Sequence, residues 1–266
     1  MNCSSYRKPP SWRWRTVAAL IFATLMGIAP RAQAADDSAT ILKKMSDYLA
    51  SQKNVSLKFD TDIEVITSTL QKLQFTSSGQ VLLNRPDKLR VTRTGGYADA
   101  ELVFDGKTAT ILGKNLNVFA QLESQGSIDQ LINKLNGEYS IGMPGADLLM
   151  SSVFDELMED VSDAKHIGRG VIDGIECEHL AFRNEDTDWQ IWIEIGPNPI
   201  PRKYVITSKA VNGAPQYTLR IKDWKTDVQI ASEAFAFRAP TGAKKVNLAE
   251  LSDIDELPRG VAGGKK

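Results

Sequence analysis

The sequence has 266 residues, with 32 basic and 33 acidic side chains and a formal net charge of −1. A chain of this length suits one large domain or two small ones. Once the N-terminal segment described below is removed, the chain is mildly acidic, so it has no electrostatic footprint for nucleic acid as a partner.

The first 34 residues have the pattern of a secretory signal peptide. Four basic residues before position 16 precede an apolar stretch from Thr16 to Ala29, and Ala32-Gln33-Ala34 supplies the small residues of a cleavage site. The apolar stretch is shorter than the roughly 20 residues that span a bilayer, which favours cleavage over an uncleaved membrane anchor. We therefore predict export to the periplasm, with cleavage near Ala34-Ala35.

Cleavage changes the charge and the cysteine count of the chain. Removing residues 1–34 takes away five basic residues and no acidic one, so the net charge falls from −1 to −6. Cys177 is then the one remaining cysteine, which rules out an internal disulfide. No later apolar run approaches membrane-spanning length, and we expect no transmembrane segment in the mature chain.

The mature chain begins with a helix followed by a long strand. Apolar residues recur at helical spacing from Ile41 to Leu49, with Asp37 or Ser38 as the N-cap. From Val55 to Val65, apolar and polar residues alternate, which predicts a strand with one buried face. Ser78-Gly79 suggests a bulge in the next strand, and Asp105-Gly106 marks a hairpin. Further short strands are expected at 74–84, 88–94, 101–104, 108–112 and 117–122.

The middle of the chain changes to helical spacing. Ser127 and Gln130 form a capping box, and the helix that follows is expected to stop at Gly137. A second helix is predicted after Pro144-Gly145, with an apolar stripe from Ala146 to Val161 that covers about four turns. Such a broad stripe needs an apolar surface to lie on, most simply the open side of a sheet.

Strands return in the last third of the chain. Trp189, Ile191 and Ile193 occupy every second position, and Asn212-Gly213 is a turn signal between two later strands. Residues 247–266 are acidic and then rich in glycine and lysine, which predicts a flexible tail after a single domain over 35–246. Strands are expected at 166–171, 175–184, 189–195, 204–206, 217–221, 226–230 and 235–237.

Three segments together resemble the periplasmic lipoprotein-carrier superfamily typified by LolA and LolB. They are Asn84–Val91 with its Arg-Pro turn, Val103–Thr108 with its Asp-Gly-Lys hairpin, and Phe235–Ala243 with an alternating Phe pair before Pro and Gly. The resemblance covers about 37–246 and is closest to an uncharacterised family of predicted periplasmic proteins. It implies an α+β fold, mainly antiparallel, in which a half-open β-barrel of about eleven strands has helices over its concave face.

The resemblance also implies an apolar cavity for acyl chains or a docking surface on the concave side. In a closed small barrel, the large apolar residues at every second position of each strand would simply form the core. In a half-closed sheet they would line a ligand cavity, because such cavities are mostly apolar. The candidate ligand-binding residues are Leu57, Phe59, Ile63, Leu89, Val91, Leu102, Phe104, Leu149, Val153, Trp189, Ile191 and Ile193.

Reactive groups are few. Cys177 and His179 share one face of a strand, but a metal site needs three or four ligands, so a half-buried strand position is the simpler interpretation. Glu185, Asp186 and Asp188 fit a solvated hairpin tip better than a calcium site. No nucleophile elbow or phosphate-binding glycine loop is present. We predict no catalytic residue, no metal and no cofactor, and hence no enzyme.

The resulting hypothesis is an exported periplasmic binding or carrier protein. It would hold an acyl chain or another apolar moiety, of a lipid or a lipoprotein, between the concave sheet and the helices. The alternative is a non-catalytic interaction or scaffold module that binds a protein partner of the cell envelope.

Overall fold

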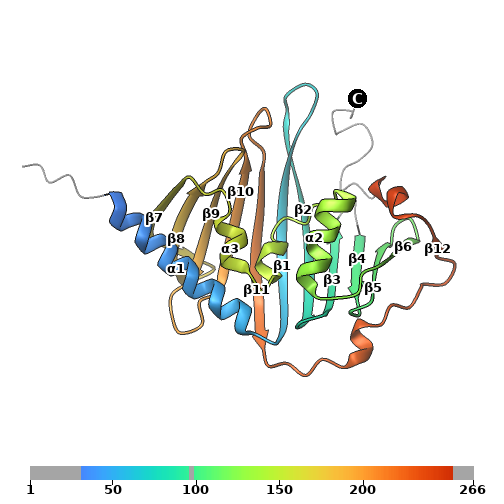
Figure 1. Ribbon diagram of the computed structural model, residues 1–266. Coiled ribbons are helices and arrows are strands. Elements are labelled where there is room, and N and C mark those ends of the chain that lie inside the picture. Colours follow the sequence, from blue (N-terminus) through green and yellow to red (C-terminus); the bar gives the residue numbers. More distant parts are fainter. Residues whose placement is uncertain (1–30, 96–98, 254–266) are drawn as a thin grey trace, which may run out of the picture. The chain divides into compact units, whose positions relative to one another are not determined.

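The computed structural model describes residues 31–95 and 99–253, and within them twelve strands form one continuous sheet (Figure 1). The strands are β1 (Asn54–Ile66), β2 (Lys72–Asn84), β3 (Lys88–Gly95), β4 (Asp99–Phe104), β5 (Thr108–Gly113), β6 (Val118–Glu123), β7 (Asp163–Ile172), β8 (Ile175–Arg183), β9 (Thr187–Glu194), β10 (Pro201–Ser208), β11 (Gln216–Thr226) and β12 (Lys244–Lys245). The helices are α1 (Arg31–Ser51), α2 (Ile128–Tyr139) and α3 (Val153–Met158), with short 3₁₀ turns η1 (Ala146–Leu149), η2 (Ser232–Phe235) and η3 (Leu248–Asp253).

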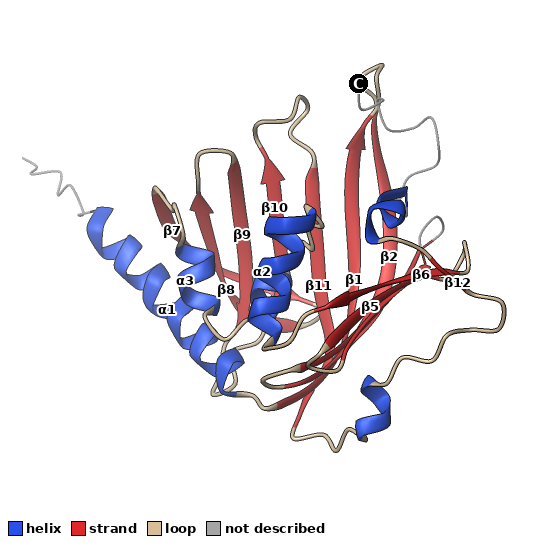
Figure 2. Ribbon diagram, turned by 45° about the vertical axis from the view of Figure 1, so that its right-hand side comes forward, coloured by secondary structure: helices blue, strands red, loops and turns tan. Residues whose placement is uncertain are grey.

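The sheet consists of two meanders joined in the middle. The strand order is β12-β6-β5-β4-β3-β2-β1-β11-β10-β9-β8-β7, so β1 and β11 connect the two halves. Every pair is antiparallel except β12 with β6. The two ends of this order do not pair with each other, and the sheet bends toward the helices (Figure 2). The predicted half-open, mainly antiparallel fold is confirmed.

The strand order explains why helices cover the concave face. β6 and β7 follow one another in the chain but lie at opposite ends of the sheet. Residues 124–162 must therefore cross the sheet, and they carry α2, η1 and α3 over the same face as α1 (Figures 1 and 2). Among the described residues, we find no helix with both the length and the apolar character needed to cross a membrane.

Two helix predictions need correction at their ends. α1 begins at Arg31 rather than at a cap on Asp37 or Ser38. The expected cleavage position falls inside it, and the signal peptide stays a prediction because residues 1–30 lie outside the described chain. The capping box of α2 is present, with the Gln130 N–H donating to Ser127 Oγ over 3.3 Å. However, α2 runs past Gly137 and ends where Ser140 takes a left-handed φ of 54°.

The long helix predicted over Ala146 to Val161 is wrong. Its place is taken by η1 and the six-residue α3. Asp129 on α2 accepts the backbone N–H of Ser151 over 3.0 Å, which withdraws that donor from a helical ladder. The apolar stripe nevertheless packs against the interior of the protein. Its buried residues are Leu148, Met150, Val153 and Leu157. Helical spacing was thus a correct indication of burial but not of conformation.

The expected strands at 226–230 and 235–237 are also wrong. β11 already has β1 and β10 on its two sides, and Asp227, with a φ of 54°, turns the chain away. Residues 227–243, here called the strap, then cross the face of β3 to β6 opposite the helices (Figure 2). Arg90 donates to the carbonyl of Ala234 over 2.8 Å, and the ring centroids of Phe237 and Phe119 are 5.1 Å apart.

The segment after the strap does not begin as the expected tail. β12 pairs with β6, and η3 follows, with Leu251 only 6% exposed. The remainder of the predicted flexible tail lies outside the described residues.

Gly79 occupies a close contact rather than the suggested bulge. The β1–β2 register passes through Phe59 opposite Gly79 without a shift, and the Phe59 ring lies over the glycine. A Cβ at position 79 would lie 2.3 Å from Phe59 Cζ and 2.3 Å from the Thr92 carbonyl oxygen.

We predict that Gly79→Ala lowers the free energy of unfolding by about 1–3 kcal/mol, because the methyl group overpacks a rigid contact. Urea unfolding measures the change. Gly137→Ala is the matched control: it meets nothing within 4 Å and sits in α2, so it should raise stability by about 0.5–1 kcal/mol. Equal effects of the two substitutions would contradict the assignment.

Candidate ligand-binding cavity

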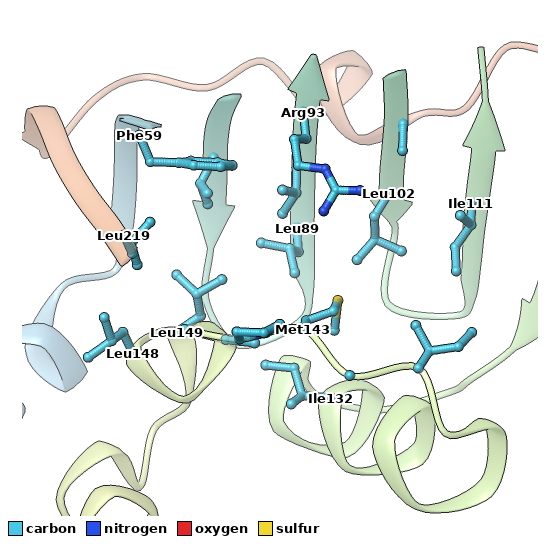
Figure 3. A pocket seen from close by; sticks show the side chains of 18 of the residues that line it. Phe59, Leu89, Arg93, Leu102, Ile111, Ile132, Met143, Leu148, Leu149 and Leu219 are labelled. Carbon is cyan, nitrogen blue, oxygen red and sulfur yellow. The ribbon is translucent and has the colours of Figure 1, made fainter. Parts of the chain in front are cut away.

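A cavity of about 920 Å³ lies between the sheet and the segment that follows α2 (Figure 3). Its floor is the concave face of β1 to β5 together with β11. Its cover, here called the roof, is residues 138–149, with Ile132 of α2 beside it. Side chains of η3 (Leu248, Ala249 and Leu251) also contribute to the lining.

The cavity occupies one half of the concave side because the other half is filled. α1 packs against β7 and α3 there, and Leu180 and Ile191 beneath them are fully buried. The Phe182 and Trp189 rings stack at 4.0 Å, and Tyr204 meets Trp189 edge-on at 5.8 Å. Over β1 to β5 the roof is a loop with one 3₁₀ turn, whose side chains leave space above the sheet.

Seven of the twelve candidate residues line the cavity. They are Leu57, Phe59, Ile63, Leu89, Val91, Leu102 and Leu149. The other five, Phe104, Val153, Trp189, Ile191 and Ile193, are not in the cavity wall and are at most 4% exposed. Sequence parity identifies the concave face of a strand but not whether a helix fills the space above it. The five residues are therefore core.

Several lining residues were not among the candidates. Leu219 and Ile221 carry the same alternation as the chosen strands and were detectable from it. The roof residues Ile141 and Met143 lie in a segment without periodicity, so the sequence held no signal for them. η3 was hidden by its acidic, tail-like composition.

Two polar contacts hold the roof in place. Arg85, in the turn between β2 and β3, donates to the Leu149 carbonyl over 2.7 Å and to the Gln52 carbonyl over 3.2 Å. Burial lowers the pKa of Arg85. On the other side, Tyr204 Oη of β10 donates to Asp147 Oδ2 over 3.2 Å. One guanidinium and one buried carboxylate thus fix η1 to the turn, the end of α1 and the sheet.

Asp147 carries a perturbed carboxyl. Burial raises its pKa from 3.8 to about 6, against the lowering effect of hydrogen bonds from the Leu148 N–H and from Tyr204. Glu156 of α3 adds a repulsive charge. Burial likewise raises the pKa of Tyr204 well above 10.0, with the neighbouring Asp147 as the second cause.

The sequence motifs with reactive groups lie outside the cavity. Cys177 is buried, and its thiol donates to the Ile175 carbonyl over 3.4 Å. Burial is the main cause that raises the pKa of this thiol. His179 shares a hydrogen bond of 3.0 Å with Gln190 and stacks on Trp192 at 4.0 Å, and burial lowers its pKa. Among the described residues, no three His, Cys, Asp or Glu side chains form a group that could hold a metal ion.

The acidic cluster is a hairpin tip. Arg183 donates to both oxygens of Asp188 over 2.8 Å, and this contact is the main reason that the pKa of Asp188 falls to about 2. Lys209 is 3.3 Å from the same carboxylate. With two cations on this carboxylate, an ion-paired turn describes the site better than a cation site.

Asp147 gives a pH-dependent prediction. The folded protein holds a proton on this carboxyl more tightly than the unfolded chain, whose value is 3.8. The resulting stability is fully present below about pH 4 and is lost as the pH rises through about 6. Asp147→Asn should therefore remove this decline and raise the free energy of unfolding at neutral pH by about 1–3 kcal/mol. Urea unfolding across the pH range measures both effects.

Asp188→Asn is the control of opposite sign. Its lowered pKa contributes stability that is present above about pH 4 and is lost as the pH falls toward 2. The Asn variant should therefore be less stable than the wild type at neutral pH. An Asp147→Asn variant that keeps the wild-type decline between pH 4 and 6 would contradict the role of Asp147.

None of the curated proteins matches the sequence. Among solved structures, an uncharacterised conserved protein from Thermus thermophilus is similar at 13% identity and a TM-score of 0.43, over 79% of this chain and 99% of that chain. The Mycobacterium tuberculosis lipoprotein LppX is similar at 14% identity and a TM-score of 0.38, over 74% of this chain and 99% of that chain.

A LolA superfamily protein, NE2245 from Nitrosomonas europaea, is similar at 12% identity and a TM-score of 0.39, over 75% of this chain and 97% of that chain. The model of a family described as "Predicted periplasmic protein (DUF2092)" matches residues 38–249. This description agrees with the periplasmic location expected from the sequence. Because that match spans most of the sequence, the chain belongs to the DUF2092 family of predicted periplasmic proteins.

Proposed function

We propose that this protein is a periplasmic binding or carrier protein that holds an acyl chain, or a comparable apolar moiety of a lipid or lipoprotein, in its cavity. The observation that carries the proposal is the hollow between β1 to β5, β11 and the roof. Its volume of about 920 Å³ lies within the range of about 300–1,000 Å³ that is typical of small-molecule sites.

The wall of the cavity suits a hydrocarbon chain. Leu57 of β1, Val81 of β2, Val91 of β3, Leu102 of β4 and Ile111 of β5 form one row across the sheet, because each is the register partner of the next. Burial of each methylene against such a surface contributes about 0.8 kcal/mol. A long chain would therefore bind without a charged contact, after the cost of immobilising it is subtracted.

The positions of the reactive side chains support binding rather than catalysis. Cys177 and His179 lie on β8, in the filled half of the sheet, and neither lines the cavity. Asp147, the carboxyl with the raised pKa, is engaged with Tyr204 and the Leu148 N–H, where it fixes the roof. Each of these side chains has structural contacts that account for its position without a substrate.

Filling the cavity should weaken binding without unfolding the protein. Val91→Trp places a large apolar ring in the middle of the floor, whereas Gln80→Trp adds the same ring to the exposed face of the neighbouring strand. The mature chain, purified from the periplasm, is analysed by native mass spectrometry and by lipid analysis of an organic extract. We expect about one acyl ligand per wild-type or Gln80→Trp molecule. Val91→Trp should bind at least about tenfold more weakly, a change of about 1.4 kcal/mol.

A wild-type protein that carries no lipid and also ignores added fatty acids and phospholipids would refute the proposal. The interaction module would then be the better hypothesis, and partner capture from the cell envelope would be the next experiment. Equal binding by wild type and Val91→Trp would place the ligand outside this cavity.

A further inference from the structure

The cavity extends across the strands of the sheet. Its floor follows the strand order from β11 through β1 to β5. In Figure 3, Leu219 of β11 and Ile111 of β5 lie on opposite sides of the cavity, and Leu89 of β3 lies between them. Leu149 and Met143 extend from the roof toward the same strands. An extended hydrocarbon chain therefore fits between floor and roof with its axis perpendicular to the strands.

The β11 end of the cavity is closed by a contact between the roof and the floor. A Cβ added to Gly145 of the roof would lie 2.9 Å from Cδ2 of Leu219, so the roof backbone rests on the floor at this point. Two residues further along the roof, Asp147 accepts the hydrogen bond from Tyr204 of β10. Beyond Tyr204 the concave side is packed, with Trp189 only 4% exposed. A bound chain cannot extend past β11.

The opposite end of the cavity is closed by η3. Ile111 of β5 lines the cavity, whereas its register partner on β6, Ala120, is buried outside the wall. η3 packs against β6 (Figure 1). Its residues Leu248 and Leu251 line the cavity, and Leu251 is itself buried. η3 therefore lies where a chain that follows the floor would reach the next strand.

The separation of these two ends sets a length for the ligand. The floor runs over β11 and β1 to β5, and neighbouring strands lie about 4.8 Å apart, so the two outer strands are about 24 Å apart. An extended acyl chain advances about 1.3 Å per carbon–carbon bond, so a chain of about 18 carbons spans about 22 Å. Such a chain would fill the cavity from one end to the other.

We propose that η3 is the end wall that limits the length of the bound acyl chain, at about 18 carbons, and that Leu248 and Leu251 select this length. This inference rests on the proposed function and adds the size class of the ligand. Each methylene up to the limit is transferred from water to an apolar surface. Further methylenes meet η3, so they add no buried area. Affinity should therefore rise with chain length and then level off.

The test measures the binding of a homologous series of ligands. Saturated fatty acids of roughly 10 to 24 carbons displace a fluorescent fatty acid from the mature protein, with each free concentration held by a cyclodextrin. The variants are Leu251→Ala and Leu248→Ala in η3, Ile111→Trp in the floor, and Leu157→Ala as control. Leu157 is a buried residue of α3 outside the cavity wall, so its substitution removes the same atoms elsewhere in the protein.

We expect the wild type and Leu157→Ala to gain about fourfold in affinity per methylene up to about 18 carbons, and nothing beyond. Leu251→Ala and Leu248→Ala shorten the end wall and should each move the limit up by about two carbons. Ile111→Trp fills the floor over the last strand, a width of about 4.8 Å, and should move the limit down by about four carbons. Misfolding would not shift the limit in opposite directions.

Two results would overturn the inference, and they are distinguishable. If affinity keeps rising to the longest acid, or if the η3 variants and Ile111→Trp keep the wild-type limit, the acyl-binding function stands and the end-wall role of η3 fails. If no fatty acid of any length binds the wild type, the proposed function fails as well. A single η3 variant that does not fold leaves the other, together with Ile111→Trp, to decide between these results.

Discussion

The antiparallel pairing of β1 with β11 determines most of the architecture. It places the first and eleventh strands side by side in the middle of the sheet, so β6 and β7 are forced to opposite ends. The connection between them must cross one face of the sheet, and it takes the concave face, where α2, the roof and α3 lie. Because of this one strand pairing, the connection between β6 and β7 lies over the sheet and covers the cavity.

The two halves of the concave side show how helix placement decides between core and cavity. β9 presents Trp189, Ile191 and Ile193 at every second position, and β3 likewise presents Leu89 and Val91, so the strands alone do not tell core from cavity. Above β9, α1 and α3 bring enough side chains to bury Trp189 and Ile191. Above β3, the roof loop leaves Leu89 and Val91 in the wall of the cavity. The function of each strand face depends on what the intervening segment places over it.

This difference also sets the limit of what the sequence reveals. Strands with a clean period of two, such as Val55 to Val65, were predicted within a residue or two, as were the Asp105-Gly106 turn and the capping box of Ser127. The helix expected at 146–161 failed because Asp129, distant in sequence, accepts the Ser151 N–H. Phe104 and Trp189 were assigned to a cavity for a similar reason. Which helix packs over a strand is decided by distant parts of the chain, and the alternation within the strand does not reveal it. Ile141 and Met143 of the roof were missed because their segment has no apolar period.

The residues after β11 wrap around the β6 edge of the sheet. Phe235 lies on one face, β12 covers the edge, and Leu251 reaches the cavity on the other face. All of them follow the eleven antiparallel strands in chain order, so a ribosome produces them after the sheet is already encoded. Until they arrive, the β6 edge is unpaired and the cavity lacks the part of its lining that η3 supplies, and unpaired edges of this kind recruit other chains. For this protein the nascent state, more than the finished one, is the stage at which protection from aggregation matters.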